Sequence, residues 1–326
     1  MPKLKKILVF TSGGDAPGMN AAIRSVVRTA DYLGIKVVGA RKGYDGIIDN
    51  DIIDLPSTAV ANIIHRGGTI LQSARSERFR TREGREIAAT NLAKNEVDAI
   101  VAIGGDGTFT GAHIFSKEHN IPVVGIPGTI DNDIFGTDYT IGFDTAVNTA
   151  VEALDKIRDT AESHSRIFFV GVMGRDAGFV AVRSGIAGGA VNIMLPEKPS
   201  DLTLFHEKLA KGWNRERKSM IVVVAEGSIE GGALAAAKIT QEKFPNDDIK
   251  VSILGHMQRG GNPSSHDRVV ASQMGLIAVE SLVDGFSNVM IGLKGRKHIK
   301  VPLSEAVKQE HLLNTELLRL IDVLSS

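Results

Sequence analysis

Short apolar runs alternate with stretches of helical periodicity along the whole chain. Four of these runs end at a cluster of glycine residues: 7–10, 99–103, 123–126 and 168–172. Apolar runs of this length are typical of buried β-strands. Further strands are predicted near 36–40, 191–195, 219–225, 250–254 and 288–293.

Apolar residues recur at helical spacing in the segments between these runs. The predicted helices are 20–33, 145–161, 177–187, 201–212, 232–243, 265–284 and 305–324. Strands that alternate with helices are typical of a parallel sheet with helices on both faces. Ligands of such sheets bind at loops that leave the carboxyl ends of the strands, which is where the glycine clusters lie.

Composition narrows the possible functions. The chain has 326 residues, 43% hydrophobic and 23% charged, which is ordinary for a globular protein of about two domains. Because 38 Lys and Arg residues balance 38 Asp and Glu residues, no bulk positive field is available for nucleic acid or an anionic membrane. Cysteine is absent, and the apolar run at 7–10 is too short for a signal peptide or membrane span. We therefore expect a cytoplasmic protein whose anion sites are local.

The first glycine cluster reads TSGGDAPGMN and follows the first predicted strand. Gly13 and Gly14 have no Cβ, so a phosphate group can approach their backbone amides closely. Pro17 suits the first turn of a helix, whose free N–H groups attract an anion. A tight turn without a ligand explains the same residues, so this motif alone indicates a phosphate site only weakly.

The second cluster, GGDGT, surrounds the carboxylate of Asp106 with three glycine residues. A carboxylate among phosphate groups would be repelled unless Mg²⁺ lay between them. Asp106 is therefore a candidate ligand of a metal ion or of its bound water. A capping aspartate at the start of a helix is the alternative explanation.

The third cluster, PGTIDND, places Asp131 and Asp133 directly after a predicted strand. Transfer of a phosphoryl group to a hydroxyl needs a base for the hydroxyl proton and carboxylates that position Mg²⁺. Two carboxylates can divide these tasks. A surface turn rich in Asp and Asn is the alternative, but it does not explain the whole heptapeptide.

Arginine residues stand beside several of these loops, and arginine suits bidentate recognition of phosphate. They are Arg75, Arg80, Arg166, Arg175 and Arg259. In a chain without net positive charge they favour a phosphorylated ligand. The chain has no G-x-x-x-x-G-K-[ST] loop and no H-R-D or D-F-G motif, so it matches neither P-loop nor protein kinases.

Six motifs occur together and in one order: SGGDAPGMNAAIR, HRGGTILQSAR, GGDGT, PGTIDND, MGRDAGF and LGHMQRGGNPS. Together they resemble the bacterial ATP-dependent 6-phosphofructokinases, from residue 7 to about 285. The resemblance implies transfer of the γ-phosphoryl group of MgATP to the 1-hydroxyl of fructose 6-phosphate. It also implies a homotetramer.

The resemblance implies a role for individual residues. The MgATP site would contain Gly14, Tyr44, Arg75, Arg80, Gly105, Asp106, Gly107 and Thr108, with Asp106 on Mg²⁺. The catalytic group would contain Asp131 as the base, supported by Thr129, Asp133, Arg75 and Arg175. The fructose 6-phosphate site would contain Thr129, Asp131, Asp133, Arg166, Met173, Gly174, Arg175, Glu226, Lys250, His256 and Arg259. Of these, Arg166 and Lys250 would reach the 6-phosphate from a neighbouring subunit.

Two positions bear on the phosphoryl donor. Pyrophosphate-dependent members of the family carry Asp where this chain has Gly107 and Lys where it has Gly128, so ATP is expected here. One position bears on the acceptor, because Lys250 stands where the family often has Arg. Lysine neutralises a phosphate without the bidentate fork, so we expect weaker sugar phosphate binding than arginine would give.

Five arginine residues resemble the family's effector site for ADP or phosphoenolpyruvate: Arg24, Arg28, Arg158, Arg215 and Arg217. Arg24 and Arg28 are four residues apart and lie on one face of a helix. Ser57 replaces an arginine that the family often has, and Val191 replaces a metal-binding glutamate. A solvated helix face is therefore the alternative to a regulatory site.

The expected fold is α/β, with two doubly wound, Rossmann-like parallel-sheet domains and the active site in the cleft between them. The larger, ATP-binding domain would contain 1–142 and 258–304, and the smaller, fructose 6-phosphate-binding domain 143–257 and 305–326. Three other functions compete with this one. They are a pyrophosphate-dependent enzyme of the same fold, an NAD kinase with a GGDGT motif, and a non-catalytic sugar phosphate sensor.

Overall fold

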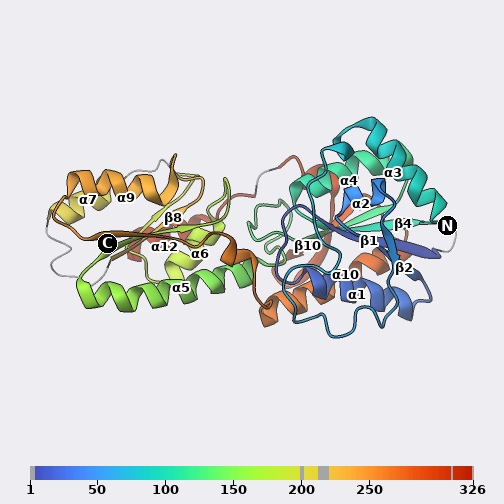
Figure 1. The fold of residues 1–326 in the computed structure, drawn as a ribbon, viewed down its shortest axis with the longest axis horizontal. Helices are drawn as coiled ribbons and strands as arrows, with labels where there is room; N and C mark the ends of the chain where they lie inside the picture. The colour runs from blue at the N-terminus through green and yellow to red at the C-terminus, as the bar shows by residue number, and fades with distance from the viewer. Residues whose placement is uncertain (1–3, 199–201, 212–219, 310, 325–326) are drawn as a thin grey trace. The chain divides into compact units, whose positions relative to one another are not determined.

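The computed structural model describes residues 4–198, 202–211, 220–309 and 311–324, which form an α/β protein with two sheets (Figure 1). Contacts within the chain define two compact units. Unit 1 contains the residues up to Thr129, Ile134–Thr145 and Arg259–His311. Unit 2 contains Ile130–Asp133, Ala146–Gln258 and the residues from Leu312 onward. Which ligand each domain binds, and the predicted domain boundaries, stay predictions.

Unit 1 is built on a seven-stranded sheet with the order β11-β10-β5-β4-β1-β2-β3 in the described part of the chain. Its strands are β1 (Lys6–Ser12), β2 (Lys36–Ala40), β3 (Ile52–Asp54), β4 (Ala99–Gly104), β5 (Val123–Pro127), β10 (Val289–Lys294) and β11 (Lys297–Pro302). The strands from β10 to β2 pair in parallel, whereas β3 and β11 are antiparallel edge strands. The predicted parallel sheet is confirmed.

Helices cover both faces of this sheet, which is why its central strands are apolar throughout rather than alternating. On one face lie α1 (Met19–Tyr32) and α10 (Ser265–Val283), and on the other α2 (Tyr44–Ile48), α3 (Arg82–Lys94) and α4 (Asp106–His119) (Figure 1). The short helices η1 (Arg78–Arg80) and α11 (Leu303–Ala306) complete the described helices of this unit. Leu8, Phe10, Phe109 and Phe115 pack in the core between sheet and helices.

Unit 2 is built on an all-parallel sheet with the order β7-β8-β6-β9. The strands are β6 (Ile167–Val172), β7 (Asn192–Met194), β8 (Met220–Ala225) and β9 (Ile249–Ile253). The helices are α5 (Phe143–His164, which begins in unit 1), α6 (Phe179–Ala187), α7 (Thr203–Ala210), α9 (Gly232–Lys243), η2 (Gly255–Arg259) and α12 (Thr315–Leu324). Phe169, Val222, Phe205 and Ala236 belong to the core that α7 and α9 share with the sheet.

Three helix predictions need correction. The single helix predicted for 305–324 is wrong, because the structure has two helices there, α11 and α12. Residues 307–309 and 311–314 between them are not helical, and the side chain of Asn314 accepts a hydrogen bond from the backbone N–H of Glu316. Helices α3 and α4 are absent from the predicted set. Buried Arg85 and Asn91 interrupt the apolar stripe of α3, and α4 begins inside a motif that resembles a turn. The predicted helix 201–212 and strand 219–225 include residues outside the described ranges.

Candidate active site

The strand register brings the three glycine motifs of unit 1 together. Ser12 of β1 pairs with Gly104 of β4, and Gly104 pairs with Pro127 of β5, so the three strands end side by side. The backbone N–H of Gly128 donates to the carbonyl oxygen of Gly104 at 2.9 Å. The hydroxyl of Thr108 donates to the carbonyl oxygen of Ser12 at 3.2 Å. These bonds fix the loops of the motifs relative to one another.

Gly104 is required by this packing. A Cβ at this position would lie 2.4 Å from Thr108 Oγ1 and 2.6 Å from the carbonyl oxygen of Ser12, closer than real Cβ contacts allow. The next residue, Gly105, caps α4, so Asp106 and Gly107 form the first turn of the helix and are exposed. A helix N-terminus with unpaired N–H groups and little side-chain cover can bind an anion.

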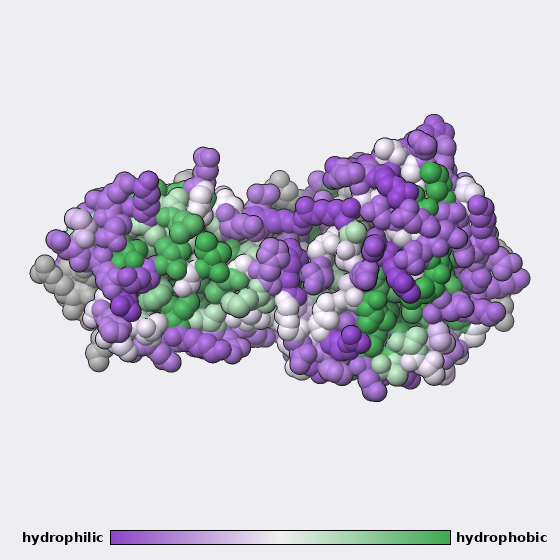
Figure 2. All heavy atoms as spheres, in the orientation of Figure 1, coloured by the Kyte–Doolittle hydropathy of each residue, from purple (hydrophilic) through white to green (hydrophobic). Residues whose placement is uncertain are grey.

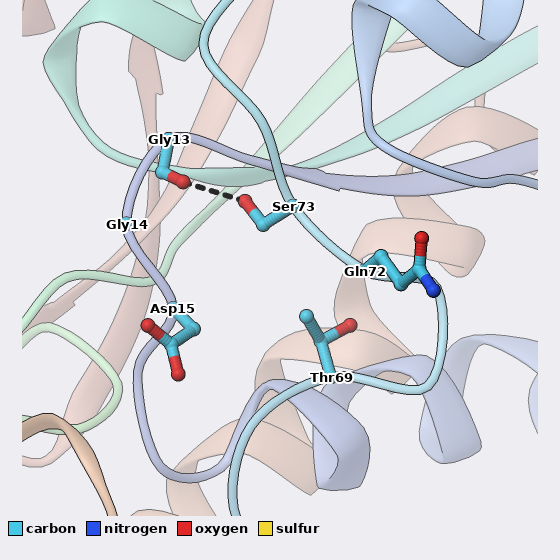
Figure 3. A pocket seen from close by; sticks show the side chains of 6 residues that line it. All are labelled: Gly13, Gly14, Asp15, Thr69, Gln72 and Ser73. Carbon is cyan, nitrogen blue, oxygen red and sulfur yellow. Dashed lines mark hydrogen bonds between the residues drawn. The ribbon is translucent and has the colours of Figure 1, made fainter.

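The segment 66–80 packs beside the first motif. The hydroxyl of Ser73 donates to the carbonyl oxygen of Gly13 at 2.6 Å, and the N–H of Gly13 donates to the carbonyl oxygen of Ala74 at 3.2 Å. A hollow of about 290 Å³ lies here, lined by Gly13, Gly14, Asp15, Thr69, Gln72 and Ser73 (Figure 3). The exposed Arg75 follows Ala74 directly, so the structure brings it to the edge of the first motif.

An ion pair supports the turn that carries Arg80. The guanidinium group of Arg85 donates to the carbonyl oxygens of Phe79 at 3.1 Å and Arg80 at 2.7 Å, and its other edge binds Glu118 at 2.5 and 2.9 Å. The hydrogen bond between them raises the pKa of Arg85 and lowers that of Glu118. Sequence reasoning missed Arg85, because one charged residue in a helix gives no signal of its distant partner.

Tyr44 lies in the core of unit 1. Its ring stacks on Phe79 with 3.8 Å between centroids, and its hydroxyl donates to the carbonyl oxygen of Thr108 at 2.6 Å. Burial raises the pKa of Tyr44 far above its ordinary value. The residue therefore touches the first turn of α4 from inside the unit.

In unit 2, Arg175 contacts two other predicted residues, Asp131 and Glu226. The guanidinium Nε of Arg175 lies 3.4 Å from the carboxylate Oδ2 of Asp131, whose side chain is 1% exposed. The backbone N–H of Arg175 donates to the carboxylate of Glu226 at 3.2 Å. Arg175 has a left-handed backbone with φ of +52°, and Gly227 leaves room for its carbonyl oxygen, which a Cβ would approach to 2.4 Å.

A buried glutamine connects two of the motifs in unit 2. The side chain of Gln258 is fully buried in η2, and its Oε1 accepts a hydrogen bond from the backbone N–H of Met173 at 2.9 Å. This bond fixes the MGRDAG loop, in which Gly174 is buried with φ of +146°. His256 in the same short helix is exposed. Gln258 lies in the LGHMQRGG motif, but it is not among the residues predicted for the site.

Arg259, Thr129 and Asp133 lie near the boundaries between the two units. The guanidinium of Arg259, in unit 1, donates to the carbonyl oxygen of Asp15 at 3.1 Å, and a Cβ on Gly14 would lie 2.5 Å from its Nη1. Arg259 thus contacts the first motif, which was predicted for the nucleotide. Buried Thr129 belongs to unit 1 and accepts a bond from Thr140 at its carbonyl oxygen, whereas Asp133 belongs to unit 2.

Arg166 and Lys250 lie far from Arg175 in the same sheet. Arg166 precedes β6, Arg175 follows it, and Lys250 pairs with Phe168 near the amino end of β6. Both cations bind one carboxylate, that of Asp248, at 2.6 Å from Arg166 Nε and 2.7 Å from Lys250 Nζ. The six residue steps from Arg166 to Val172, at about 3.3 Å each, span about 20 Å along the strand, and Arg175 lies beyond its carboxyl end.

The described residues predicted for the effector site are divided between the two units. Arg24 and Arg28 lie on α1 in unit 1, where nearby Ser57 donates to Asp31 at 2.5 Å. Arg158 lies on α5 in unit 2, and its guanidinium donates to the carbonyl oxygens of Gly188 and Gly189 at the end of α6. Val191 is buried in the core of unit 2. Arg215 and Arg217 lie outside the described residues.

Known proteins resemble this chain over its whole length. Residues 6–282 match the family model described as Phosphofructokinase. "ATP-dependent 6-phosphofructokinase 1" of Thermus thermophilus is 54% identical over 322 residues, which cover 99% of this chain and 100% of that relative. "ATP-dependent 6-phosphofructokinase" of Cytophaga hutchinsonii is 51% identical, with 99% of this chain and 98% of the relative covered.

Solved structures share the fold. The phosphofructokinase of Saccharomyces cerevisiae matches with a TM-score of 0.87 and 37% identity over 98% of this chain and 47% of the yeast chain, so this chain spans about half the yeast chain's length. The pyrophosphate-dependent phosphofructokinase of Marinobacter aquaeolei matches with a TM-score of 0.85 and 26% identity, covering 96% of this chain and 86% of that one. Relatives with this fold thus include proteins named for a different donor.

Proposed function

Since this chain belongs to the phosphofructokinase family, we propose that it transfers the γ-phosphoryl group of ATP to the 1-hydroxyl of fructose 6-phosphate. The products are fructose 1,6-bisphosphate and ADP, and the reaction is the committed step of glycolysis. The names of the curated relatives that match the whole chain favour ATP over pyrophosphate. The observation that carries the assignment of residues is the buried carboxylate of Asp131 in contact with Arg175.

Asp131 is the proposed base that accepts the proton of the 1-hydroxyl. Its side chain is 1% exposed, so a bound hydroxyl would meet this carboxylate in surroundings with little water. Arg175 contacts Asp131 with one of five N–H donors and is 47% exposed, so it can also compensate charge on the transferring phosphoryl group. Thr129 and Asp133 are proposed to support the hydroxyl.

Phosphoryl transfer in this family needs a divalent metal, and Asp106 is the residue proposed to hold Mg²⁺. Asp106 is exposed in the first turn of α4, next to Gly105 and Gly107, which supports this fit. One exposed carboxylate is what a cation shared with substrate phosphates requires. When bound, Mg²⁺ would neutralise charge on those phosphates. Gly14, Gly105, Gly107, Thr108, Arg75 and Arg80 are proposed to surround the nucleotide, and Tyr44 to support Thr108.

Two glycine positions bear differently on the choice of donor. A Cβ on Gly107 would meet no atom within 4 Å, so packing in the protein does not demand glycine here. A Cβ on Gly128 would lie 3.1 Å from Ile103 Cγ2 and 3.2 Å from Met19 Cε, so packing alone disfavours a larger side chain there. Gly107 is therefore the position at which space for ATP is the better explanation.

The sugar phosphate site is proposed to use two copies of the chain. Arg166 and Arg175 lie at opposite ends of β6, so the two arginines are proposed to reach the sugar phosphate from different copies. Unit 2 also exposes large apolar side chains, among them Ile253 and Met257, and Figure 2 shows hydrophobic patches on its drawn face. Met173, Gly174, Glu226, His256 and Arg259 complete the proposed site, and a homotetramer is the proposed assembly.

Regulation by ADP or phosphoenolpyruvate is proposed through Arg24, Arg28 and Arg158, together with Arg215 and Arg217. Arg158 already donates to the carbonyl oxygens of Gly188 and Gly189 at the end of α6, which leaves fewer cations for an anion than five arginines suggest. Rates that do not respond to either effector at subsaturating fructose 6-phosphate would contradict this proposal. No helix within the described ranges is long and apolar enough to cross a membrane. A cytoplasmic location stays a prediction.

A coupled assay for fructose 1,6-bisphosphate tests the reaction, with ATP or pyrophosphate as donor, with and without Mg²⁺, and with Asp131→Ala. We expect product from ATP only in the presence of the cation, and a rate lower by orders of magnitude in the variant. Product from pyrophosphate alone would contradict the donor. A folded protein that forms no product with either donor would favour the sugar phosphate sensor.

A further inference from the structure

The two cations proposed for the 6-phosphate already have an anion of their own. Asp248 receives Arg166 Nε on Oδ2 at 2.6 Å and Lys250 Nζ on Oδ1 at 2.7 Å, so each carboxylate oxygen binds a different cation. The three side chains are partly exposed, at 27%, 43% and 47% for Arg166, Asp248 and Lys250. A ligand can therefore reach the cluster, and a phosphate that arrives there meets a carboxylate in place.

We propose that Asp248 is a built-in counter-ion of the 6-phosphate site, which competes with the sugar phosphate for Arg166 and Lys250 and so lowers its affinity. This inference rests on the proposed function, because it takes these two cations as phosphate ligands. Asp248 is a positioning and affinity-setting residue, not a catalytic one. Neither the nucleotide nor the transferred phosphoryl group is proposed to touch it.

Charge counting gives the direction of the effect. Two cations and one carboxylate leave the cluster with a net charge of +1, whereas the pair without the carboxylate would carry +2. Hydrogen bonds from Lys250 and then Arg166 lower the pKa of Asp248, so the carboxylate is ionised at neutral pH. A phosphate dianion that replaces the carboxylate must first break its contacts with the two cations. A dianion that binds beside the carboxylate meets a like charge within a few ångströms.

The backbone around Asp248 does not depend on its side chain. The carbonyl oxygen of Asp248 accepts a hydrogen bond from the N–H of Ile167 at 3.1 Å, and β9 continues from Ile249 in parallel register with β6. Removing the carboxylate charge therefore leaves the strand pairing that carries Arg166 and Lys250 intact. A purely structural role would predict a loss of sugar phosphate affinity on removal, and the counter-ion role predicts a gain.

The test compares Asp248→Asn, Asp248→Glu, Lys250→Gln and Glu242→Gln in the full-length enzyme, by steady-state kinetics with fructose 6-phosphate and MgATP varied separately. Asp248→Asn is expected to lower the half-saturating concentration of fructose 6-phosphate by about threefold to tenfold. The effect falls on this constant and not on kcat or the KM for ATP. Asp248→Glu restores the original value, because it returns the charge. Glu242, an exposed residue of α9, is the matched control for removing one negative charge from unit 2.

Lys250→Gln separates the proposed 6-phosphate site from the proposed counter-ion. If Lys250 binds the phosphate, its removal must raise the half-saturating concentration of fructose 6-phosphate. If Lys250→Gln raises it and Asp248→Asn leaves it unchanged or raises it, the cations are phosphate ligands and the counter-ion inference is wrong. If Lys250→Gln has no effect, the assignment of the 6-phosphate to this cluster is wrong, and the inference fails with it. An equal gain in Glu242→Gln would show a general charge effect and would also overturn the inference.

Discussion

In unit 1 the loops that follow β1, β4 and β5 are bonded through backbone amides and hydroxyl groups, whereas in unit 2 Arg175, Arg166 and Lys250 bind carboxylates. In unit 1, Gly128, Thr108 and Ser73 donate to carbonyl oxygens of neighbouring loops. In unit 2, Arg175 contacts Asp131 and Glu226, while Arg166 and Lys250 share Asp248.

This difference has a chemical reason. Backbone contacts leave little freedom and no charge that a substrate could displace, so the loops proposed for the nucleotide are formed before it binds. Side-chain ion pairs on a protein surface are weak and can be exchanged for a ligand. We therefore expect substitutions in unit 1 to change how the nucleotide fits its preformed loops, and substitutions in unit 2 to change ion pairs that a substrate can displace. The following predictions test this from the largest effect to the smallest.

The largest effect is expected from Asp131→Asn. The amide keeps the shape of the buried side chain but cannot accept the hydroxyl proton, so kcat should fall by about 10²- to 10⁴-fold. Arg175 is 47% exposed, so loss of the carboxylate leaves no buried unpaired cation, and the fold should survive. The coupled assay measures the rate, and circular dichroism checks the fold.

Asp176→Asn is the matched control, because Asp176 is an exposed carboxylate next to Arg175 that has no proposed part in the reaction. Asp131 would lose its role as the base if both variants retained full activity. A similar loss in both would indicate that charge near Arg175, rather than proton transfer, sets the rate.

The next effect is expected from Gly107→Asp in unit 1. A side chain here meets no protein atom within 4 Å of its Cβ, and a carboxylate suits the first turn of α4, so stability should not fall. The new charge would repel nucleotide phosphates, and the ratio kcat/KM for ATP should fall by at least about tenfold. Thermal unfolding and ATP kinetics measure the two results.

Gly107→Asn adds the same bulk without the charge, so its kcat/KM for ATP should fall clearly less. An equal loss in the two variants would show that bulk at this position, rather than charge, reduces the use of ATP. A drop in thermal stability would instead show that the position is needed for packing.

A smaller effect is expected from Lys250→Arg in unit 2. Arginine can bind phosphate with two parallel N–H bonds, so the half-saturating concentration of fructose 6-phosphate should fall by about threefold. Varying fructose 6-phosphate at saturating MgATP measures this value. Unchanged or weaker binding would mean that the bidentate fork has no role here.

The smallest effect on activity is expected from Tyr44→Phe in unit 1. The variant keeps the ring that stacks on Phe79 but removes the hydroxyl that donates to Thr108, which should cost about 1–2 kcal/mol in the free energy of unfolding. Urea unfolding measures this cost. A large rise in the KM for ATP without a loss of stability would indicate direct contact between the Tyr44 hydroxyl and the nucleotide.

The sequence alone determined the fold class and the identity of the motifs. Apolar runs followed by glycine and aspartate predict parallel strands with ligand loops at their carboxyl ends, and each pattern lies within about ten residues of the chain. Such local patterns are readable because strand burial and turn geometry act on neighbouring residues. They failed for α3, whose buried Arg85 and Asn91 interrupt the apolar stripe, because partners elsewhere in the chain satisfy both side chains.

The tertiary structure alone decided which distant residues touch. Gln258 bonds to Met173 across 85 positions, Arg166 to Asp248 across 82, and Arg259 to Asp15 across 244. No spacing rule links residues this far apart, since their contact depends on strand order and on which loops meet at one edge of a sheet. The same physics separates Arg166 from Arg175, which are near in sequence but lie at opposite ends of one strand.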